Sequence, residues 1–389
     1  MSELFAFKDA DIHVLDDLIK ENSVELGRGD VISKIDIRDT PGPYPIYSSS
    51  AQNNGKMGEY GKFMFDEELI TWSVDGGGKF FYRPKHKFSV TNVCGYLRLK
   101  SKRIDYKYLH SILEFQHERL SFDYQNKAHP SVIRELYQVP LLEIEEQQKI
   151  AEILTSVDEV IEKTQSQINK LEDLKKATMN ELLTKGISHT EFKETEIGRI
   201  PKVWKTCNLS EVCTLINGRA YSLNEWEKEG TPVIRLQNLT NYGGTFYYSN
   251  LVLPDKNYCH KGDLLYMWSA SFGPFIWWGD KAIFHYHIWK IEPNHSLILK
   301  KYLFYLLEHR TDAWKSKSSG MAMFHLTKEG MEKEILAVPS LDEQSLISEI
   351  LETIKKQVED QQDKLTFLKN LKKSLMQDLL TGKVRVTMN

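Results

Sequence analysis

The chain contains one long helical sequence twice. Residues 146–184 and 343–381 align without a gap at an offset of 197 residues, and 16 of the 39 aligned positions are identical. Neither copy contains proline or glycine, and both are rich in Glu, Lys, Leu and Gln, which favour helix. A different segment, dense in aromatic and turn residues, precedes each copy. The repeat therefore predicts two related halves, each with a globular segment followed by a long helix.

Apolar residues in both copies follow a 3-4 spacing, which predicts one apolar stripe per helix and a coiled-coil seam. The seam positions are Ile150, Leu154, Val157, Ile161, Ile168, Leu171 and Leu182 in the first copy, and Ile347, Leu351, Ile354, Val358, Leu365, Leu368, Leu375 and Leu379 in the second. Polar residues interrupt the seam at matched places, Thr164 with Gln361 and Lys175 with Lys372. Such interruptions set register, so we expect the two helices of one chain to pair. A coiled coil between two chains is the alternative.

The globular segments alternate short apolar runs with Gly, Asn, Asp and Pro, which favours a mixed module with a curved sheet. Strands are expected near 69–74, 80–82, 93–99, 233–236 and 282–291, and helices at 106–118 and 299–310. The expected fold class is α+β, with two globular domains separated by two long antiparallel coiled-coil helices in a pseudo-twofold repeat. The expected domains are 1–138 and 188–338, each followed by a helical spacer, 139–187 and 339–389.

Composition limits the function classes. The net charge is −3, so any DNA contact must use locally clustered basic groups rather than a generally basic surface. No segment has the length and apolarity of a membrane span, and the amino-terminal sequence lacks the pattern of a signal peptide. Four cysteines without CxxC spacing predict neither zinc nor disulfides. We therefore expect a cytoplasmic protein that does not contact a membrane.

Candidate DNA-contacting residues are side chains that suit phosphates or base edges. Arginine pairs well with guanine and Asn or Gln with adenine, while Lys and Ser hold phosphates. The candidates are Asn53, Asn54, Lys79, Arg83, Lys85 and Lys87 in the first globular segment, and Arg219, Tyr221, Arg235, Asn238, Lys315, Lys317 and Ser319 in the second. Residues 315–320 are interpreted as a phosphate-contacting loop. Turn chemistry and solvated loops are the alternative interpretation for several of these residues.

Signatures of catalysis are missing from the sequence. It contains no HExxH metal motif, no complete phosphate-binding loop and no Asn/Asp-Pro-Pro-aromatic motif of an amino-methyltransferase. We expect no catalytic residues, no metal site and no cofactor in this chain. An enzyme whose motifs are unrecognised is one competing hypothesis.

The ordered motifs resemble the specificity subunit of type I restriction–modification systems over essentially the whole chain. Val139-Pro140-Leu141 leads into Glu146-Gln147-Gln148-Lys149-Ile150. Residues 195–201 (TEIGRIP) with Trp204 open the second globular segment, followed by residues 230–235 (GTPVIR). Residues 379–386 (LLTGKVRV) end the second helix. The first globular segment lacks the Ile-Pro…Trp start of the second.

The resemblance implies two target recognition domains that read the two halves of a bipartite double-stranded DNA target. The helices are then spacers that set the gap between half-sites and bind two modification subunits. Those partners would carry S-adenosylmethionine and methylate adenine N6, and restriction subunits would supply ATP- and Mg²⁺-dependent cleavage. The alternatives are the specificity subunit of a methylation-only or type IIB-like system, and a coiled-coil interaction scaffold without a DNA role.

Overall fold

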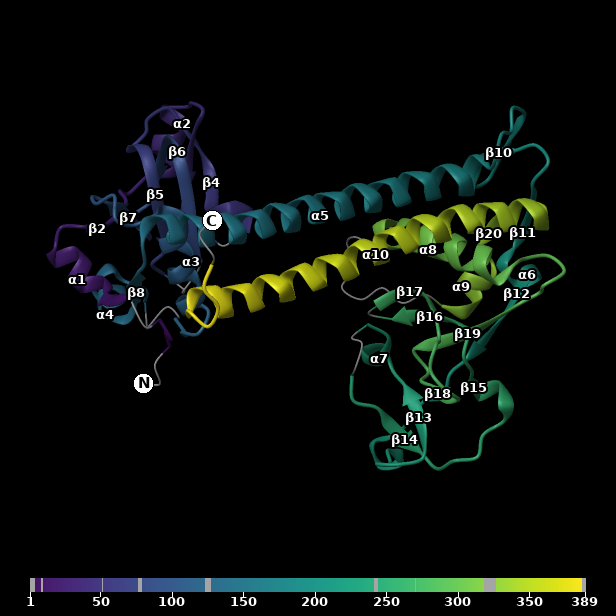
Figure 1. The fold of residues 1–389 in the computed structure, drawn as a ribbon. Coiled ribbons are helices and arrows are strands. Elements are labelled where there is room, and N and C mark those ends of the chain that lie inside the picture. The colour runs from purple at the N-terminus through teal and green to yellow at the C-terminus, as the bar shows by residue number, and fades with distance from the viewer. Residues whose placement is uncertain are drawn as a thin grey trace. The chain divides into compact units, whose positions relative to one another are not determined.

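The computed structural model describes residues 4–7, 10–50, 52–75, 79–122, 127–240, 244–269, 271–317 and 327–386. The chain divides into two compact units (Figure 1). Unit 1 contains residues 1–166 and 363–389, and unit 2 contains residues 167–362. Within the described ranges, no helix is both long and apolar enough to cross a membrane. The predicted four-part division of the chain groups the residues differently from these units and stays a prediction.

Two long helices, α5 (Ile144–Lys185) and α10 (Leu341–Leu380), each contribute one half to each unit. In unit 1 the first half of α5 packs on the last half of α10, where Asp158 and Lys372 form an ion pair of 2.6 Å. In unit 2 the last half of α5 packs on the first half of α10. Both pairings run antiparallel, as the repeat predicts.

The predicted seam lies mostly in the packed face of the helices. Ile150, Leu154, Ile168, Ile347, Leu351, Ile354, Val358, Leu365 and Leu379 are buried, and Val157, Ile161, Leu171, Leu182, Leu368 and Leu375 are half-buried. Met179, Leu183, Met376 and Leu380 are also buried, although the 3-4 pattern did not include them. The globular part of each unit packs against a second side of the helix ends, so the buried face there is wider than a coiled-coil stripe.

The first long helix begins later than predicted. Residues 138–141 form strand β8 (Gln138–Leu141), which pairs antiparallel with β1 (Asp11–Val14). Pro140 has no backbone N–H, but it can occupy a strand that has a single partner. The spacer expected to be helical from residue 139 therefore begins with strand residues, and its helix starts at Ile144.

The globular part of unit 1 is built on a six-stranded sheet in the order β2-β7-β5-β6-β3-β4, in which only the β3–β6 pair is parallel. Its strands are β2 (Val24–Arg28), β3 (Tyr44–Tyr47), β4 (Lys56–Tyr60), β5 (Phe65–Ser73), β6 (Phe80–Val90) and β7 (Cys94–Leu99). The helices are α1 (Leu15–Lys20), α2 (Lys34–Asp39), α3 (Tyr106–His117) and α4 (Pro130–Leu136), with a short 3-10 turn η1 (Gln52–Gly55). Trp72, Phe80 and Tyr108 are fully buried where α3 covers the sheet.

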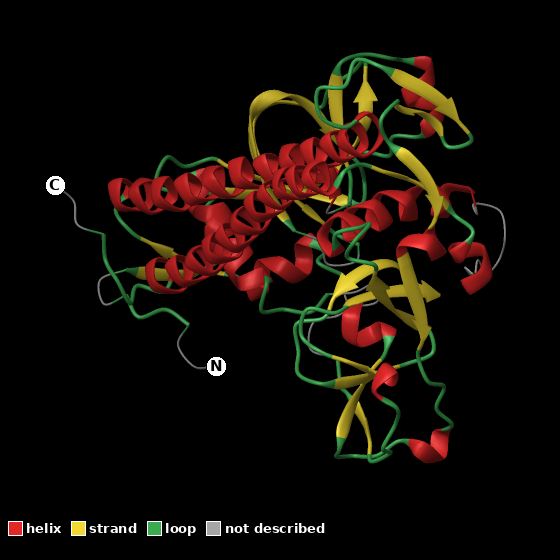
Figure 2. Ribbon diagram, turned by 90° about the vertical axis from the view of Figure 1, so that its right-hand side faces the viewer, coloured by secondary structure: helices red, strands yellow, loops and turns green. Residues whose placement is uncertain are grey.

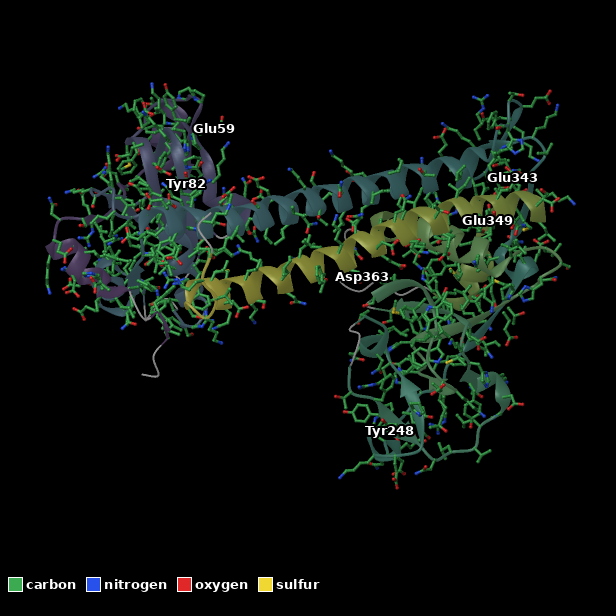
Figure 3. The ribbon with its side chains drawn as sticks, viewed as in Figure 1. Glu59, Tyr82, Tyr248, Glu343, Glu349 and Asp363 are labelled. Carbon is green, nitrogen blue, oxygen red and sulfur yellow. The ribbon has the colours of Figure 1, made fainter. Side chains whose placement is uncertain are left out.

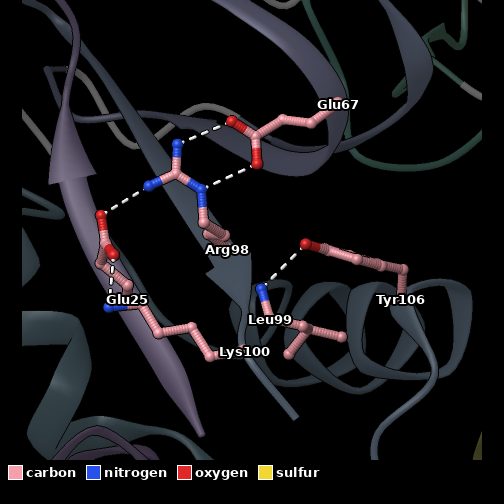
Figure 4. Close-up of polar contacts among 6 residues, drawn as sticks. All are labelled: Glu25, Glu67, Arg98, Leu99, Lys100 and Tyr106. Carbon is pink, nitrogen blue, oxygen red and sulfur yellow. Dashed lines mark hydrogen bonds and ion pairs between the residues drawn. The ribbon is translucent and has the colours of Figure 1, made fainter. Parts of the chain in front are cut away.

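A charged network ties three strands of this sheet together (Figure 4). Arg98 on β7 donates two hydrogen bonds of 2.7 and 2.8 Å to Glu67 on β5 and one of 2.7 Å to Glu25 on β2. Lys100 pairs with the other oxygen of Glu25 at 2.7 Å, and this bond is the main reason that the pKa of Glu25 is lowered. The network joins β2, β7 and β5, which lie at the opposite side of the sheet from β3 and β4.

Unit 2 carries two four-stranded sheets (Figure 2), in the orders β12-β19-β16-β17 and β14-β13-β18-β15. The strands of unit 2 are β9 (Phe192–Thr195), β10 (Gly198–Pro201), β11 (Lys205–Asn208), β12 (Cys213–Asn217), β13 (Thr231–Ile234), β14 (Tyr247–Ser249), β15 (Tyr258–Cys259), β16 (Leu264–Ser269), β17 (Ser271–Ile276), β18 (Ala282–Phe284), β19 (Ile288–Pro293) and β20 (Ile335–Val338). Its shorter helices are α6 (Leu209–Val212), α7 (Leu236–Thr240), α8 (Lys300–Lys317) and α9 (Lys328–Glu332), with 3-10 turns η2 (Leu223–Glu225) and η3 (Asp255–Asn257).

Two strand predictions in unit 2 need correction. The single strand expected over 282–291 is two strands, β18 and β19, which belong to different sheets and are separated at residues 285–287. The strand expected over 233–236 ends at Ile234, and Leu236 begins α7. Periodicity over so short a run does not show where a strand leaves its sheet.

Each long helix holds its globular part through one buried glutamine. Gln147 Nε2 donates to the carbonyls of Arg103 and Leu142, both at 2.8 Å, and its Oε1 accepts from Asp105 N at 2.9 Å. Gln344, 197 residues later, makes the same three kinds of bond with Leu297, Pro339 and Leu299 at 2.9, 3.0 and 2.7 Å. Both glutamines are fully buried. The repeat therefore includes the anchor that places α3 and α8 on the long helices.

The preceding glutamates bind the chain that leaves the other long helix. Glu343 (labelled in Figure 3) accepts from Ile187 N at 3.0 Å, from His189 Nε2 at 2.8 Å and from Trp204 Nε1 at 3.0 Å. In unit 1, Glu146 instead accepts two bonds of 2.7 and 2.6 Å from Arg385.

The amino-terminal segment completes the unit 1 junction. Ala6 N donates to Thr381 O at 2.6 Å, and Phe7 lies against Gly382. Phe7 stands 197 positions before Trp204, so it occupies the place that the Ile-Pro…Trp start fills in unit 2. At this junction unit 1 brings together segments that are far apart in the chain, where unit 2 uses continuous chain.

Replacing Arg385 by alanine is expected to lower the free energy of unfolding by about 1–3 kcal/mol, because the carboxylate of Glu146 is only 8% exposed and would lose its partner. Urea denaturation followed by fluorescence measures the change. Arg38→Ala, which removes an exposed ion pair with Asp39, is the control and should change the value by less than about 0.5 kcal/mol. Equal effects of the two substitutions would contradict a role for Arg385 in closing unit 1.

Candidate nucleic-acid interface

The candidates of unit 1 lie in two places on one sheet. Asn53 and Asn54 belong to the exposed turn η1 between β3 and β4, whereas Lys85 and Lys87 are exposed on β6. The ammonium of Lys87 lies 4.7 Å from the ring centroid of Phe63, so an aromatic side chain accompanies this charge. Lys79 is also exposed, but it lies just before the first residue of β6, whereas Lys87 lies near the last. The structure therefore does not bring the two lysines close together.

Arg83 differs from its neighbours because it is buried. The residue is 1% exposed, and its guanidinium stacks on Tyr47 at 3.6 Å from the ring centroid. A side chain in this position does not present its charge to a duplex at the surface of unit 1. A direct DNA contact from Arg83 stays a prediction, and its surroundings point to a supporting role.

Unit 2 brings three separately predicted residues together. The ring of Trp226 lies 4.8 Å from the rings of both Tyr221 and Tyr247. The guanidinium of Arg219 lies 4.4 Å from the Tyr221 centroid, and that of Arg235 lies 4.1 Å from the Tyr247 centroid. We call these five residues the arginine–aromatic cluster. Arg219 follows β12 and Arg235 follows β13, so the ends of strands from both four-stranded sheets of unit 2 meet here.

The two arginines of the cluster have different electrostatic surroundings. Arg219 forms an ion pair with Glu225, which also accepts bonds of 2.9 Å from the N–H and hydroxyl of Ser222. The Ser222 N–H and the Arg219 guanidinium lower the pKa of Glu225 to about 2, so this carboxylate neutralises Arg219 at neutral pH. Arg235 forms no ion pair within the described part of the chain, and its Nε atom is buried without a hydrogen-bond partner there. Arg235 is the better placed of the two to bind an electronegative ligand.

His285 lies beside this cluster, with its ring 6.1 Å from that of Trp226, and carries no charge at neutral pH. Burial, then the proximity of His287 and Arg235, lowers the pKa of His285 to about 4. The imidazole is therefore neutral at pH 7, and Arg235 keeps the only full charge of the two. Within the described ranges, no three His, Cys, Asp or Glu side chains form a metal-binding group.

Asn238 supports this site from beneath. It is 8% exposed, its Oδ1 accepts from Arg235 N at 2.9 Å, and its Nδ2 donates to Gly244 O at 3.0 Å. The amide is thus engaged in holding the segment that follows β13. The prediction that Asn238 contacts DNA stays untested.

The predicted phosphate-contacting loop at 315–320 needs correction. Lys315 and Lys317 belong to the last turn of α8, while Ser319 lies outside the described residues. The helix continues because Trp314 is buried in the core of unit 2, and no glycine interrupts the sequence before Gly320. Composition indicated a loop, but the packing of one tryptophan extends the helix.

Neither Trp226 nor Tyr247 stands out in the amino-acid sequence as a candidate contact. Tyr247 is 41% exposed and Trp226 is half-buried. Nothing in the local sequence separates a core tryptophan from one at the surface. The one sequence signal for these two aromatic residues is their proximity to Arg219 and Arg235 in the chain.

Comparison with known proteins gives a consistent result. The profile of the family described as "Type I restriction modification DNA specificity domain" matches residues 22–173 and again residues 201–372. The type I restriction enzyme MjaVIII specificity subunit of Methanocaldococcus jannaschii is 27% identical over 377 residues, which cover 89% of this chain and 87% of that protein. The type I restriction enzyme MpnII specificity subunit of Mycoplasma pneumoniae is 36% identical over 140 residues, 35% of this chain and 42% of that protein.

Solved structures share the fold. The S subunit of a type I restriction–modification system from M. genitalium superposes with a TM-score of 0.63 at 17% sequence identity, and the alignment covers 100% of both chains. A chain from a study of complex assembly and conformational transition of the type I R-M system gives a TM-score of 0.57 at 14% identity, covering 93% of this chain and 98% of that one.

Replacing Arg235 by alanine is expected to weaken discrimination at one base pair of a DNA target by roughly 10-fold or more, because a bidentate arginine contact to guanine would be lost. Competition binding among duplexes that differ at single base pairs measures this. Lys228→Ala, an exposed cation of the same unit, is the control and should leave the discrimination unchanged. Equal loss across all sequences, with a weaker salt dependence, would instead make Arg235 a phosphate contact.

Proposed function

We propose that this chain, which belongs to the family of type I restriction modification DNA specificity proteins, selects the DNA sequence on which a type I restriction–modification complex acts. The proposal rests on one observation. The family profile matches the chain twice, and each match includes a globular part with its own set of exposed polar side chains. A protein with two such parts suits a bipartite duplex target, in which each part reads one half-site.

The two halves offer different chemistry to DNA. Unit 1 presents consecutive carboxamides at η1 and exposed lysines on β6, and unit 2 presents Arg235 on an aromatic support. Carboxamides suit adenine and arginine suits guanine. Because the two units share one chain, binding of one half-site raises the effective concentration of the other unit at the second half-site.

We assign the reactions to partner subunits rather than to this chain. Two modification subunits would bind S-adenosylmethionine and methylate adenine, and restriction subunits would use ATP and Mg²⁺ to cleave DNA. A base inside a duplex must be flipped out for such chemistry, a task for the modification subunits. The whole complex would act on DNA in the cytoplasm.

Exposed apolar residues on the long helices support a pair of identical partners. Leu174 on α5 and Leu371 on α10 are 197 positions apart, one in each unit, and are 49% and 37% exposed. Phe367, one turn before Leu371, is 65% exposed. Exposed apolar side chains at repeated positions are what two copies of one subunit would require for docking.

Lengthening both long helices tests the proposed function. Seven residues inserted after Thr164 and seven after Gln361 lengthen each helix by about 10 Å. That length corresponds to about three base pairs at a rise of 3.4 Å, so the preferred gap between half-sites is expected to grow by about that amount. Mapping of methylated adenines in cells that express the variant with its modification subunit measures the gap.

Seven-residue deletions at the same two places are the matched control, and they should shorten the gap. An unchanged gap in both variants would contradict a spacer role for the helices. Methylation without any bipartite consensus would contradict the proposed function itself and would favour an interaction scaffold.

The double substitution Phe367→Ser/Leu371→Ser is expected to weaken binding of the modification subunit by at least 10-fold, because it removes apolar contact area while leaving the buried seam intact. Titration of the purified subunits by calorimetry measures the affinity. Lys369→Ser, an exposed position on the same stretch of α10, is the control. Unchanged affinity in the double variant, with normal thermal stability, would exclude this face as the docking surface.

A further inference from the structure

The turn η1 presents three carboxamide side chains in succession, those of Gln52, Asn53 and Asn54, and all three residues are exposed. Asn53 and Asn54 have φ values of +49° and +53°, and Gly55 follows with +76°. Among residues other than glycine, asparagine adopts this left-handed region most readily. The backbone of the turn thus has one defined shape, which holds the amides outward.

Arg83 lies beneath this turn without a counter-ion. Its guanidinium stacks between Tyr47, at 3.6 Å from the ring centroid, and Phe81, at 4.6 Å, and its Nε donates to Thr71 Oγ1 at 3.0 Å. No carboxylate in the described part of the chain forms an ion pair with it, and its Nη2 has no hydrogen-bond partner there. Burial lowers the pKa of Arg83 to about 10, which still leaves it charged at neutral pH. A buried charge in such surroundings is costly, so this arginine is poorly explained by stability alone.

The free end of the guanidinium faces the base of the turn. A Cβ placed on Gly55 would lie 3.1 Å from Arg83 Nη2 and 3.4 Å from the carbonyl oxygens of Ser48 and Ser50. The guanidinium and these carbonyls therefore border one narrow space beneath η1. Ser48 N donates to Gly55 O at 2.8 Å and closes the turn across that space.

We propose that Arg83 is a positioning residue that sets the orientation of η1, and that the carboxamides of η1 read an adenine in the half-site bound by unit 1. The positive charge of Arg83 favours carbonyl oxygens turned inward, and the turn then directs the amides of Asn53 and Asn54 outward. An amide side chain can donate to N7 or accept from the N6 amino group of adenine in the major groove. This inference rests on the proposed function, because it names the base class that one reading site would recognise.

A role through the turn differs measurably from a direct phosphate contact. A cation that binds a phosphate changes the salt dependence of binding by about one unit of slope when it is removed, and it weakens all sequences alike. A positioning residue changes selectivity at the base pair read by the turn and leaves the salt slope unchanged. A residue that only stabilises the fold lowers the melting temperature without changing selectivity.

The test is a double-mutant cycle between Arg83→Met and Asn53→Ala/Asn54→Ala in the complex with the modification subunit. Binding is measured by competition among duplexes that vary one base pair at a time, at two salt concentrations. Each change alone is expected to reduce discrimination at the same adenine position of one half-site by roughly 10-fold. The combined variant is expected to lose no more than the Asn53→Ala/Asn54→Ala variant, because Arg83 acts through those residues.

Gly55→Ala tests the same space from the other side, since its Cβ would crowd Arg83 Nη2 and the residue has a positive φ. This substitution should reduce discrimination at the same base pair as Arg83→Met does. Gly58→Ala on β4 is its matched control, because a Cβ there meets nothing within 4 Å. Lys102→Met, an exposed cation of unit 1 outside the candidate contacts, controls for loss of charge. Arg83→Lys keeps a positive charge in the site and replaces Arg83→Met in the cycle if Arg83→Met does not fold.

Additive losses in the cycle, or a lower salt slope for Arg83→Met, would overturn the proposal in favour of a direct contact. Unchanged selectivity in Arg83→Met, Arg83→Lys and Gly55→Ala would overturn it as well. These results are distinct from a failure of the proposed function, in which the wild-type complex itself would show no bipartite selectivity.

Discussion

A single buried glutamine at the start of each long helix joins that helix to the globular part of its unit. Gln147 and Gln344 bind both the chain entering the helix and the chain entering the shorter helix beside it. Each of these bonds satisfies a polar group that would otherwise be buried alone, at a cost of about 1–3 kcal/mol. The glutamines thereby fix each globular part to a rigid helix, and the glutamates before them bind the chain leaving the other helix.

The two units reach the same junction by different chemistry. In unit 2 the carboxylate of Glu343 binds a neighbouring stretch of continuous chain that ends in Trp204. In unit 1 the carboxylate of Glu146 binds Arg385, while Phe7 takes the place of the tryptophan. The Arg385–Glu146 pair makes two parallel hydrogen bonds, and such a bidentate pair fixes the direction of the contact. The two junctions therefore join corresponding parts of the chain, although different residue types make the contacts.

Within each globular part, the charged side chains near the candidate contacts have different surroundings. Glu225 neutralises Arg219 and leaves Arg235 as the charge that faces the aromatic cluster without a carboxylate of its own in the described part of the chain. Arg83 is hidden under a turn whose amides are exposed. In unit 1 a buried arginine lies beneath exposed carboxamides, and in unit 2 a carboxylate neutralises one of the two half-buried arginines of the cluster.

The amino-acid sequence alone predicts the duplication, the two long helices around residues 146–184 and 343–381, their apolar stripe and the α+β class, because these follow from periodicity and composition that repeat over many residues. It also identified most of the polar groups that now lie near one another in unit 2. Tertiary contacts were needed to show that residues 138–141 pair as a strand, that residues 282–291 divide between two sheets, and that α8 continues through Lys317. They also show that Arg83 is buried whereas Arg235 is half-buried. Such outcomes depend on contacts between residues far apart in the chain, and local pattern carries no information about which of two similar side chains those contacts will cover.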